Sequence, residues 1–290
     1  MNQNISRGIG LFIASQFVGA LVDTPAKYLL SQGLPLSTVV FFRYAIAFAI
    51  LYASFLVRQK MPQRSQHIRV NLFRGALLTS STFLNFYSVG QLPLAVVMSI
   101  NFAAPLISCA LAPFLLHEKV GPRRWAAVVV GFIGVLIVMR PVGQTFQLAM
   151  LTSLTNALVI ALYQIYTRRA GAGDDPETGL VWVFALGTTI TAFIVPFHWQ
   201  APSFNLWPIV ALMGVSGLVT HFIISHALRL APASLLAPFI YLNIIWITIF
   251  GIVIFGDWPD QWTIAGSAII IASGIYVWWR ERVRAQPAEI

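Results

Sequence analysis

The sequence predicts an all-α polytopic membrane protein in which ten transmembrane helices form two inverted five-helix repeats. The first observation is the mean hydropathy of +0.79. Charged residues make up 9% of the 290 residues, against about 25% in soluble domains. The second observation is an internal repeat, because a shift of 139 positions places Pro93 on Pro232 and Glu118 on Asp257. Apolar residues extend along the whole chain, so a water-soluble core is excluded.

The third observation is that the two repeats carry opposite charge at equivalent places. Loop 117–124 (HEKVGPRR) is basic, whereas its counterpart 256–263 (GDWPDQWT) is acidic. Lys and Arg collect in the cytoplasmic loops of membrane proteins. The same structural position is therefore expected on opposite sides of the membrane in the two halves, an inversion that is typical of secondary transporters.

Ten apolar runs are long enough to cross a bilayer, which takes about 20 helical residues. Gly, Pro and Ser mark the short joints between them. Five runs lie in each half, which predicts a first repeat at 1–145 and a second, inverted repeat at 146–290. The predicted spans are 8–30, 36–57, 70–90, 93–116, 122–140, 147–168, 178–197, 206–228, 232–255 and 261–279.

The distribution of Lys and Arg predicts the orientation of these spans. With the N-terminus in the cytoplasm, 15 of the 18 Lys and Arg residues fall in inside segments and one, Arg140, falls outside. The other two, Lys27 and Arg43, lie within spans. This bias predicts a multi-pass protein of the cell inner (plasma) membrane with both termini cytoplasmic.

Several other function classes are excluded or disfavoured by the composition. The net charge is +9, but the basic residues stand in short loops, so topology explains them better than nucleic-acid binding does. Cys109 is the single cysteine, and His221 and His226 are five apart on a helix, so no metal-ligand spacing is present. We expect no cofactor, no metal and no catalytic residue, because the chain has no P-loop and no hydrolase or metalloprotease motif.

Taken in order, the residues resemble the EamA type of the drug/metabolite transporter superfamily. The resemblance covers nearly the whole chain and is carried by DTPAKYLL (23–30), FFRYAIAFAI (41–50), LPLAVVMSINFAAP (92–105), HEK (117–119) and GFIGVLIV (131–138), and more loosely by APASLLAPFIYLN (231–243), FGD (255–257) and AGSAIIIASGIYV (265–277). It implies two inverted bundles around a central cavity and transport of metabolites by alternating access. The chain is similar to the aromatic and neutral amino-acid exporters of the YddG type.

Three charged residues inside spans form the first candidate group. Asp23, Lys27 and Arg43 each cost about 2.5–3.5 kcal/mol at the centre of a helix, so each is expected to face a partner or a cavity. Lys27 follows Asp23 by four residues, and Arg43 is expected at a similar depth. A structural ion cluster and a gate or carboxylate-binding site are both open, and Asp23 as a proton-coupling carboxylate is a further hypothesis.

The second candidate group is polar or aromatic and lies near mid-membrane, where transporter substrates bind. Pro105 lacks a backbone N–H and frees the carbonyl of Asn101 one turn earlier. Packing between helices is the alternative role for such residues. The candidates for the cavity are Asn101, Tyr241, Asn243, Trp246, Asn156, Tyr163, Ser80 and Asn85.

We therefore expect a secondary transporter that exports small metabolites, most favourably aromatic or neutral amino acids. The alternatives are uptake of a nucleoside, riboflavin or S-adenosylmethionine, and a membrane scaffold without transport. The expected partners are a small-molecule solute and the lipid bilayer, with a homodimer left open because some proteins of this fold pair.

Overall fold

The computed structural model describes residues 3–59, 65, 68–117, 120–141, 147–170 and 176–285. All regular elements of this part of the chain are helical. They are α1 (Gln3–Ser31), α2 (Leu36–Val57), α3 (Ile68–Gln91), α4 (Leu94–Asn101), α5 (Ala103–Leu115), α6 (Pro122–Met139), α7 (Leu148–Ala170), α8 (Pro176–Ile194), η1 (Val195–His198), η2 (Phe204–Leu206), α9 (Trp207–Leu230), α10 (Ala233–Leu236), η3 (Ala237–Leu242), α11 (Asn243–Phe255) and α12 (Gln261–Ala285).

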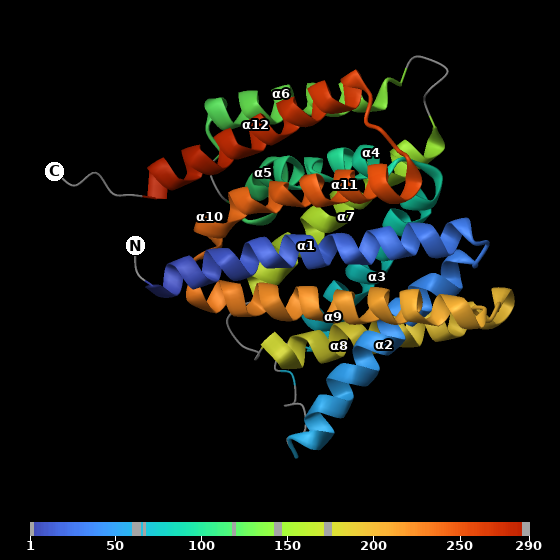
Figure 1. The fold of residues 1–290 in the computed structure, drawn as a ribbon. Helices are drawn as coiled ribbons and strands as arrows, with labels where there is room; N and C mark the ends of the chain where they lie inside the picture. The colour runs from blue at the N-terminus through green and yellow to red at the C-terminus, as the bar shows by residue number, and fades with distance from the viewer. Residues whose placement is uncertain are drawn as a thin grey trace.

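The described elements form the ten predicted crossings. Six are single helices, and the other four combine α4 with α5, α8 with η1, η2 with α9, and α10 and η3 with α11. The helix α1 begins and α12 ends at the same end of the bundle (Figure 1), as an even number of crossings requires. We call this end the inner end and the opposite one the outer end, following the predicted topology. The predicted boundary at 145/146 falls outside the described residues.

Nine of the described crossings are long and apolar enough to span a membrane, and α3 is the exception. Its 24 residues are sufficient in length. It is less apolar because Thr79, Ser81, Thr82, Asn85 and Ser88 lie along it. Polar side chains of this kind are tolerated in a membrane where they face the bundle interior or a cavity.

Two crossings are interrupted near their middle. The first breaks at Phe102, between α4 and α5, because Pro105 cannot donate a backbone hydrogen bond to the carbonyl of Asn101. The second changes to a 3₁₀ segment at η3, with Pro238 at its start, before α11 begins at Asn243. Broken helices at the midplane of inverted repeats are typical of transporter binding sites.

The helices pack in pairs that the inverted repeat relates to one another. Crossing one (α1) packs on crossing eight (α9), and its counterpart is crossing six (α7) on crossing three (α3). Crossings two and seven (α2 and α8), four and nine (α4 and α11), and five and ten (α6 and α12) pair with their own equivalents. Figure 1 shows α6 and α12 side by side at one edge of the bundle.

Glycine allows the close approach of α6 and α12. A Cβ atom at Gly266 would lie 2.6 Å from the carbonyl oxygen of Gly134 and 2.5 Å from Cγ2 of Val138. A Cβ atom at Gly134 would in turn lie 2.9 Å from the carbonyl oxygen of Gly266. These glycines therefore let the two backbones touch, as small residues do at helix interfaces in membranes.

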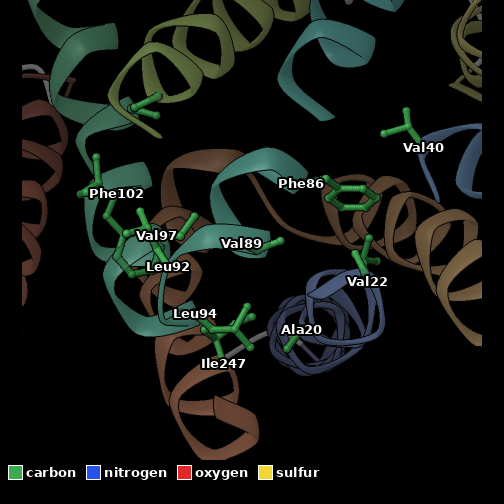
Figure 2. Close-up of a cluster of buried hydrophobic side chains, with 14 of the residues drawn as sticks. Ala20, Val22, Val40, Phe86, Val89, Leu92, Leu94, Val97, Phe102 and Ile247 are labelled. Carbon is green, nitrogen blue, oxygen red and sulfur yellow. The ribbon is translucent and has the colours of Figure 1, made fainter. Parts of the chain in front are cut away.

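An apolar cluster joins α1, α4 and α11 in the outer half of the bundle. Figure 2 shows Leu94 of α4 with Ile247 of α11, and Ala20 of α1 beside them. Leu94 and Ile247 are each 1% exposed. This cluster packs both broken crossings against α1.

Candidate functional site

A cavity of about 250 Å³ lies between the two repeats. The first repeat contributes α1 to α5 to its wall, and the second contributes α7, η3 and α11. Both broken crossings therefore border it. Six of the residues predicted for the site or the charge cluster line it, namely Asp23, Arg43, Asn85, Asn101, Asn156 and Asn243.

Ser80 was predicted to lie in the cavity, and the structure places it elsewhere. It is exposed on α3, whereas the next residue, Ser81, is buried and lines the cavity. One residue rotates the side chain by about 100° around a helix. The sequence placed the polar run on α3 but did not show which of its members faces inward.

Three aromatic candidates also lie outside the cavity lining. Tyr241 packs edge-on against Phe102, with ring centroids 5.0 Å apart. Trp246 packs against Phe17 at 5.0 Å, and the ring of Tyr163 lies 5.6 Å from the guanidinium of Arg74. These three side chains make helix–helix contacts, which is the packing role left open for them.

A chain of hydrogen bonds connects five of the lining residues. The amide nitrogen of Asn85 donates to Asp23 Oδ1 at 2.8 Å, and Asn101 donates to Asn85 Oδ1 at 2.8 Å. Asn156 donates to Asn101 Oδ1 at 3.0 Å, and Ser81 Oγ donates to Asn156 Oδ1 at 2.7 Å. We call this chain the amide ladder. It joins α1, α3, α4 and α7, and so links both repeats.

Arg43 is a buried cation on the cavity wall. Its Nη1 donates to Thr82 Oγ1 at 2.6 Å, and its guanidinium lies 5.0 Å from the ring of Tyr44. Its Nε is buried without a hydrogen-bond partner in the protein. Within the described residues, no carboxylate lies within 4.0 Å of it. Its positive charge is thus available to a ligand in the cavity.

Polar residues that the sequence reasoning did not select complete the lining. Gln16 of α1 and Gln164 of α7 both border the cavity. Asn243 donates from Nδ2 to the carbonyl of Gln16 at 2.7 Å, while its Oδ1 is buried without a partner. Both glutamines lie inside predicted apolar spans, and this position could have identified them as candidates for the cavity. Phe86 and Phe102 provide aromatic wall.

Lys27 does not join Asp23 and Arg43 in one ion cluster. Its Nζ lies 2.5 Å from Oδ2 of Asp257, donates to the carbonyl of Leu92 at 2.9 Å, and lies 4.9 Å from the ring of Phe255. The long stem of the lysine carries its charge towards the outer end. Gly256, at φ 70°, turns the chain after α11 so that Asp257 meets it. Lys27 thus ties α1 to two joints on the outer side of the cavity.

A second ion pair lies at the same end. Arg140, which follows α6, lies 2.7 Å from Asp260, which precedes α12. Partial burial raises the pKa of Asp260, but hydrogen bonds from Thr263 and the charge of Arg140 outweigh it, so the pKa is lowered overall. One acidic joint, 256–260, therefore supplies carboxylates to two basic residues of the first repeat.

Comparison with known proteins gives the same family twice along the chain. The model of the EamA-like transporter family matches residues 6–140 and again residues 147–279. A solved crystal structure with 16% sequence identity superposes with a TM-score of 0.63, over 94% of this chain and 99% of that one. That likeness concerns the fold alone.

Curated relatives of similar length are named as transporters. The S-adenosylmethionine uptake transporter of Rickettsia bellii is 26% identical over 96% of this chain and 95% of its own. The riboflavin transporter of Vibrio cholerae is 29% identical over 89% of this chain and 88% of its own. Both names fit the uptake alternative better than the expected amino-acid export.

Proposed function

Because the chain belongs to the EamA-like transporter family and is a membrane transporter, we propose that it carries a zwitterionic metabolite through its central cavity by alternating access. S-adenosylmethionine is the first candidate, and uptake is the first candidate direction. We place the protein in the inner membrane with both termini cytoplasmic. A homodimer stays a prediction.

The observation that carries the proposal is the pair of opposite charges on the cavity wall. Asp23 and Arg43 both line the cavity, yet they are more than 4.0 Å apart and form no ion pair. Charges inside a membrane are costly, and they face a water-filled cavity, pair with one another or bond backbone carbonyls. A solute with one cationic and one carboxylate group satisfies both residues at once.

The broken crossings support the binding of a carboxylate. The helices α5 and α11 begin at Ala103 and Asn243, next to the cavity. The N-terminus of a helix carries partial positive charge, and half-helices of transporters direct it at anionic substrate groups. Arg43 lines the same cavity and adds a full positive charge that favours a carboxylate.

The remaining lining suits a solute with an aromatic or heterocyclic portion. Phe86 and Phe102 offer apolar faces, and the free Oδ1 of Asn243 can accept a hydrogen bond from a ring amine. S-adenosylmethionine has an amine, a sulfonium, a carboxylate and an adenine ring. Riboflavin lacks the charged groups, so it offers no partner of opposite charge to Asp23 or to Arg43.

Amino-acid transport is the second candidate. An aromatic amino acid carries the same two charges and a ring, so the argument from Asp23 and Arg43 applies to it equally. The similar proteins are named for S-adenosylmethionine and riboflavin, which is why the amino acid ranks below S-adenosylmethionine here.

The test is flux of radiolabelled S-adenosylmethionine, tryptophan and riboflavin, each measured separately, into proteoliposomes that contain the purified protein. Competitors separate the candidates: S-adenosylhomocysteine lacks the sulfonium charge, methionine and tryptophan lack the nucleoside, and riboflavin lacks the zwitterion. We expect Arg43→Met to abolish saturable flux. Thr79→Val is the matched control, because Thr79 is buried on α3 and bonds its own helix at the carbonyl of Gly75, at 2.8 Å.

Two results would contradict the proposal. The first is saturable flux of labelled riboflavin without flux of either labelled zwitterion. The second is flux in Arg43→Met that equals the flux of Thr79→Val. Saturable flux of labelled tryptophan without flux of labelled S-adenosylmethionine would keep the zwitterion and replace the first candidate with the second.

A further inference from the structure

The amide ladder has one direction in this structure, and the carboxylate sets it. An ionised carboxylate can only accept hydrogen bonds, so Asn85 must turn its nitrogen towards Asp23. The oxygen of Asn85 then faces Asn101, and the oxygen of Asn101 faces Asn156. Each amide therefore donates towards Asp23, and the ladder ends at the hydroxyl of Ser81.

The same five residues can also form the ladder in the opposite direction. A protonated Asp23 can donate to Asn85, and each amide can exchange the places of its oxygen and nitrogen by a half-turn with little movement of other atoms. Ser81 would then accept from Asn156, since a hydroxyl both donates and accepts. Its own proton can go to the carbonyl of Leu77, four residues earlier, as Thr82 donates to Leu78 at 2.9 Å.

We propose that Asp23 binds a proton in one stage of the transport cycle, and that the amide ladder reverses to hold it. The proton comes from water in the cavity, and it leaves when the cationic group of the solute binds the carboxylate. The link to transport rests on the proposed function. The reversal of the ladder is independent of the proposed function, because it involves only five side chains: Asp23, Asn85, Asn101, Asn156 and Ser81.

Reversal matters because a buried polar group without a partner is costly. A protonated carboxyl group beside a fixed donor still accepts through its carbonyl oxygen, but its new O–H finds no acceptor in the ladder. With a reversible ladder, both protonation states of Asp23 keep every hydrogen bond of the chain. Asn85, Asn101 and Asn156 are thus positioning residues, and two of them act on Asp23 without touching it.

Other ionisable groups near Asp23 are engaged elsewhere or lie across the cavity. Arg43 of α2 faces the cavity and bonds Thr82. Lys27, one turn further along α1, is paired with Asp257. Within the described residues, three of the remaining groups on elements packed against α1 point outward: Tyr52 of α2, stacked on Phe48, and the exposed Arg69 and Tyr87 of α3. The others are Tyr44 of α2, bonded to Thr82; Arg74 of α3, bonded to Asn71 and Thr167; His221 of α9, against Phe184; His226 of α9, near the carbonyl of Phe222; Arg229 at the inner end of α9; and Tyr241 of η3, against Phe102.

Because the carboxylate of Asp23 binds either a proton or the cationic group of the solute, the transporter exchanges one for the other. Solute that moves inward drives a proton outward, and an acidic exterior drives solute outward. The direction of net flux is then set by the larger gradient.

The first test needs no solute. Proton titration of the purified protein in detergent is compared between the natural chain and Asp23→Asn, which keeps an oxygen acceptor for Asn85 but cannot ionise. We expect the difference between the two curves to be one proton. Asn101→Leu removes the hydrogen bonds to Asn85 and Asn156, so the ladder is interrupted two residues from Asp23. It should move the midpoint of the difference titration curve by about half a pH unit or more. Thr79→Val, outside the ladder, should leave it in place.

A midpoint that is unchanged in Asn101→Leu, or a difference curve without a titrating proton, overturns the ladder whatever the solute is. The second test adds S-adenosylmethionine to weakly buffered protein. We expect release of one proton per bound solute in the natural chain and none in Asp23→Asn. A titrating Asp23 with no solute bound, from any of the candidates, would overturn the proposed function and leave the ladder standing.

Discussion

Substitution of Lys27 by methionine should open the outer end of the cavity. Methionine keeps an unbranched side chain of similar length but removes the ion pair with Asp257 and the hydrogen bond to the carbonyl of Leu92. Asp257 would then stand beside Phe255 without its cation. The closed arrangement of α1 against the joints 91–93 and 256–260 should lose stability relative to an open one.

The exposure of the two partners sets the size of the effect. The side chain of Lys27 is 13% exposed and that of Asp257 is 26% exposed, so the pair is neither a surface pair nor a fully buried one. Surface pairs contribute about 0.2–1 kcal/mol, and removing one partner of a buried pair costs about 3–5 kcal/mol. We therefore expect about 1–3 kcal/mol, which is about a 5- to 150-fold change in the ratio of closed to open protein.

Cysteine labelling measures this ratio. Cys109 is the single cysteine of the chain, so Cys109→Ser provides a background in which Met98→Cys reports from the cavity wall. A membrane-impermeant maleimide added at the outer face should label Met98→Cys faster when Lys27→Met is present. The exchanged pair Lys27→Asp with Asp257→Lys should restore slow labelling.

Arg140→Met is the matched comparison, because its ion pair with Asp260 is at the same end and its partners are 30% and 41% exposed. Its effect should stay within the range of a surface pair, under about 1 kcal/mol. An unchanged labelling rate in Lys27→Met would refute the reasoning. An equal acceleration by Arg140→Met would show that general loosening, rather than the Lys27 contacts, controls access.

Three further predictions concern packing, ligand affinity and acid stability. Gly266→Ala should lower the stability of the detergent-solubilised protein by about 1–3 kcal/mol in thermal unfolding, because its Cβ would meet Gly134, whereas Gly10→Ala, with nothing within 4 Å, should not. Arg43→Met should weaken solute binding about 10- to 150-fold in calorimetry, the value of a charge-assisted hydrogen bond of about 1.5–3 kcal/mol, and an unchanged affinity would exclude contact with the solute. The pKa of Asp260 is lowered in the folded state, so the contribution of its ionised form to stability is complete at neutral pH and is lost as the pH falls below about 4. Asp260→Asn should therefore lose less melting temperature on acidification than the natural chain. Equal losses would contradict this.

Much of the architecture could be predicted because the membrane restricts the choices. A spanning segment must satisfy its backbone internally, so each apolar run of sufficient length becomes a helix. Pro105 predicted the freed carbonyl of Asn101, but the span 93–116 was predicted as one helix, and the break at Phe102 appears only in the structure. The polar run on α3 marked that helix as one that faces the interior.

The partners of individual side chains could not be predicted in the same way. Lys27 was expected beside Asp23, four residues away, and it binds Asp257, 230 residues away. Ser80 and Ser81 are equally polar, and the rotation of α3 decides between them. Tyr241 and Trp246 lie in the predicted crossing but turn towards Phe102 and Phe17.

The sequence by itself determined the ten crossings, the inverted repeat and the presence of polar residues inside the spans. Hydropathy, loop charge and proline act locally along the chain, so they can be read without the fold. The tertiary structure alone decided that Asn85, Asn101 and Asn156 meet in one hydrogen-bonded ladder ending at Asp23. Contacts between four helices depend on their rotation and depth, and these are set by packing across the whole bundle.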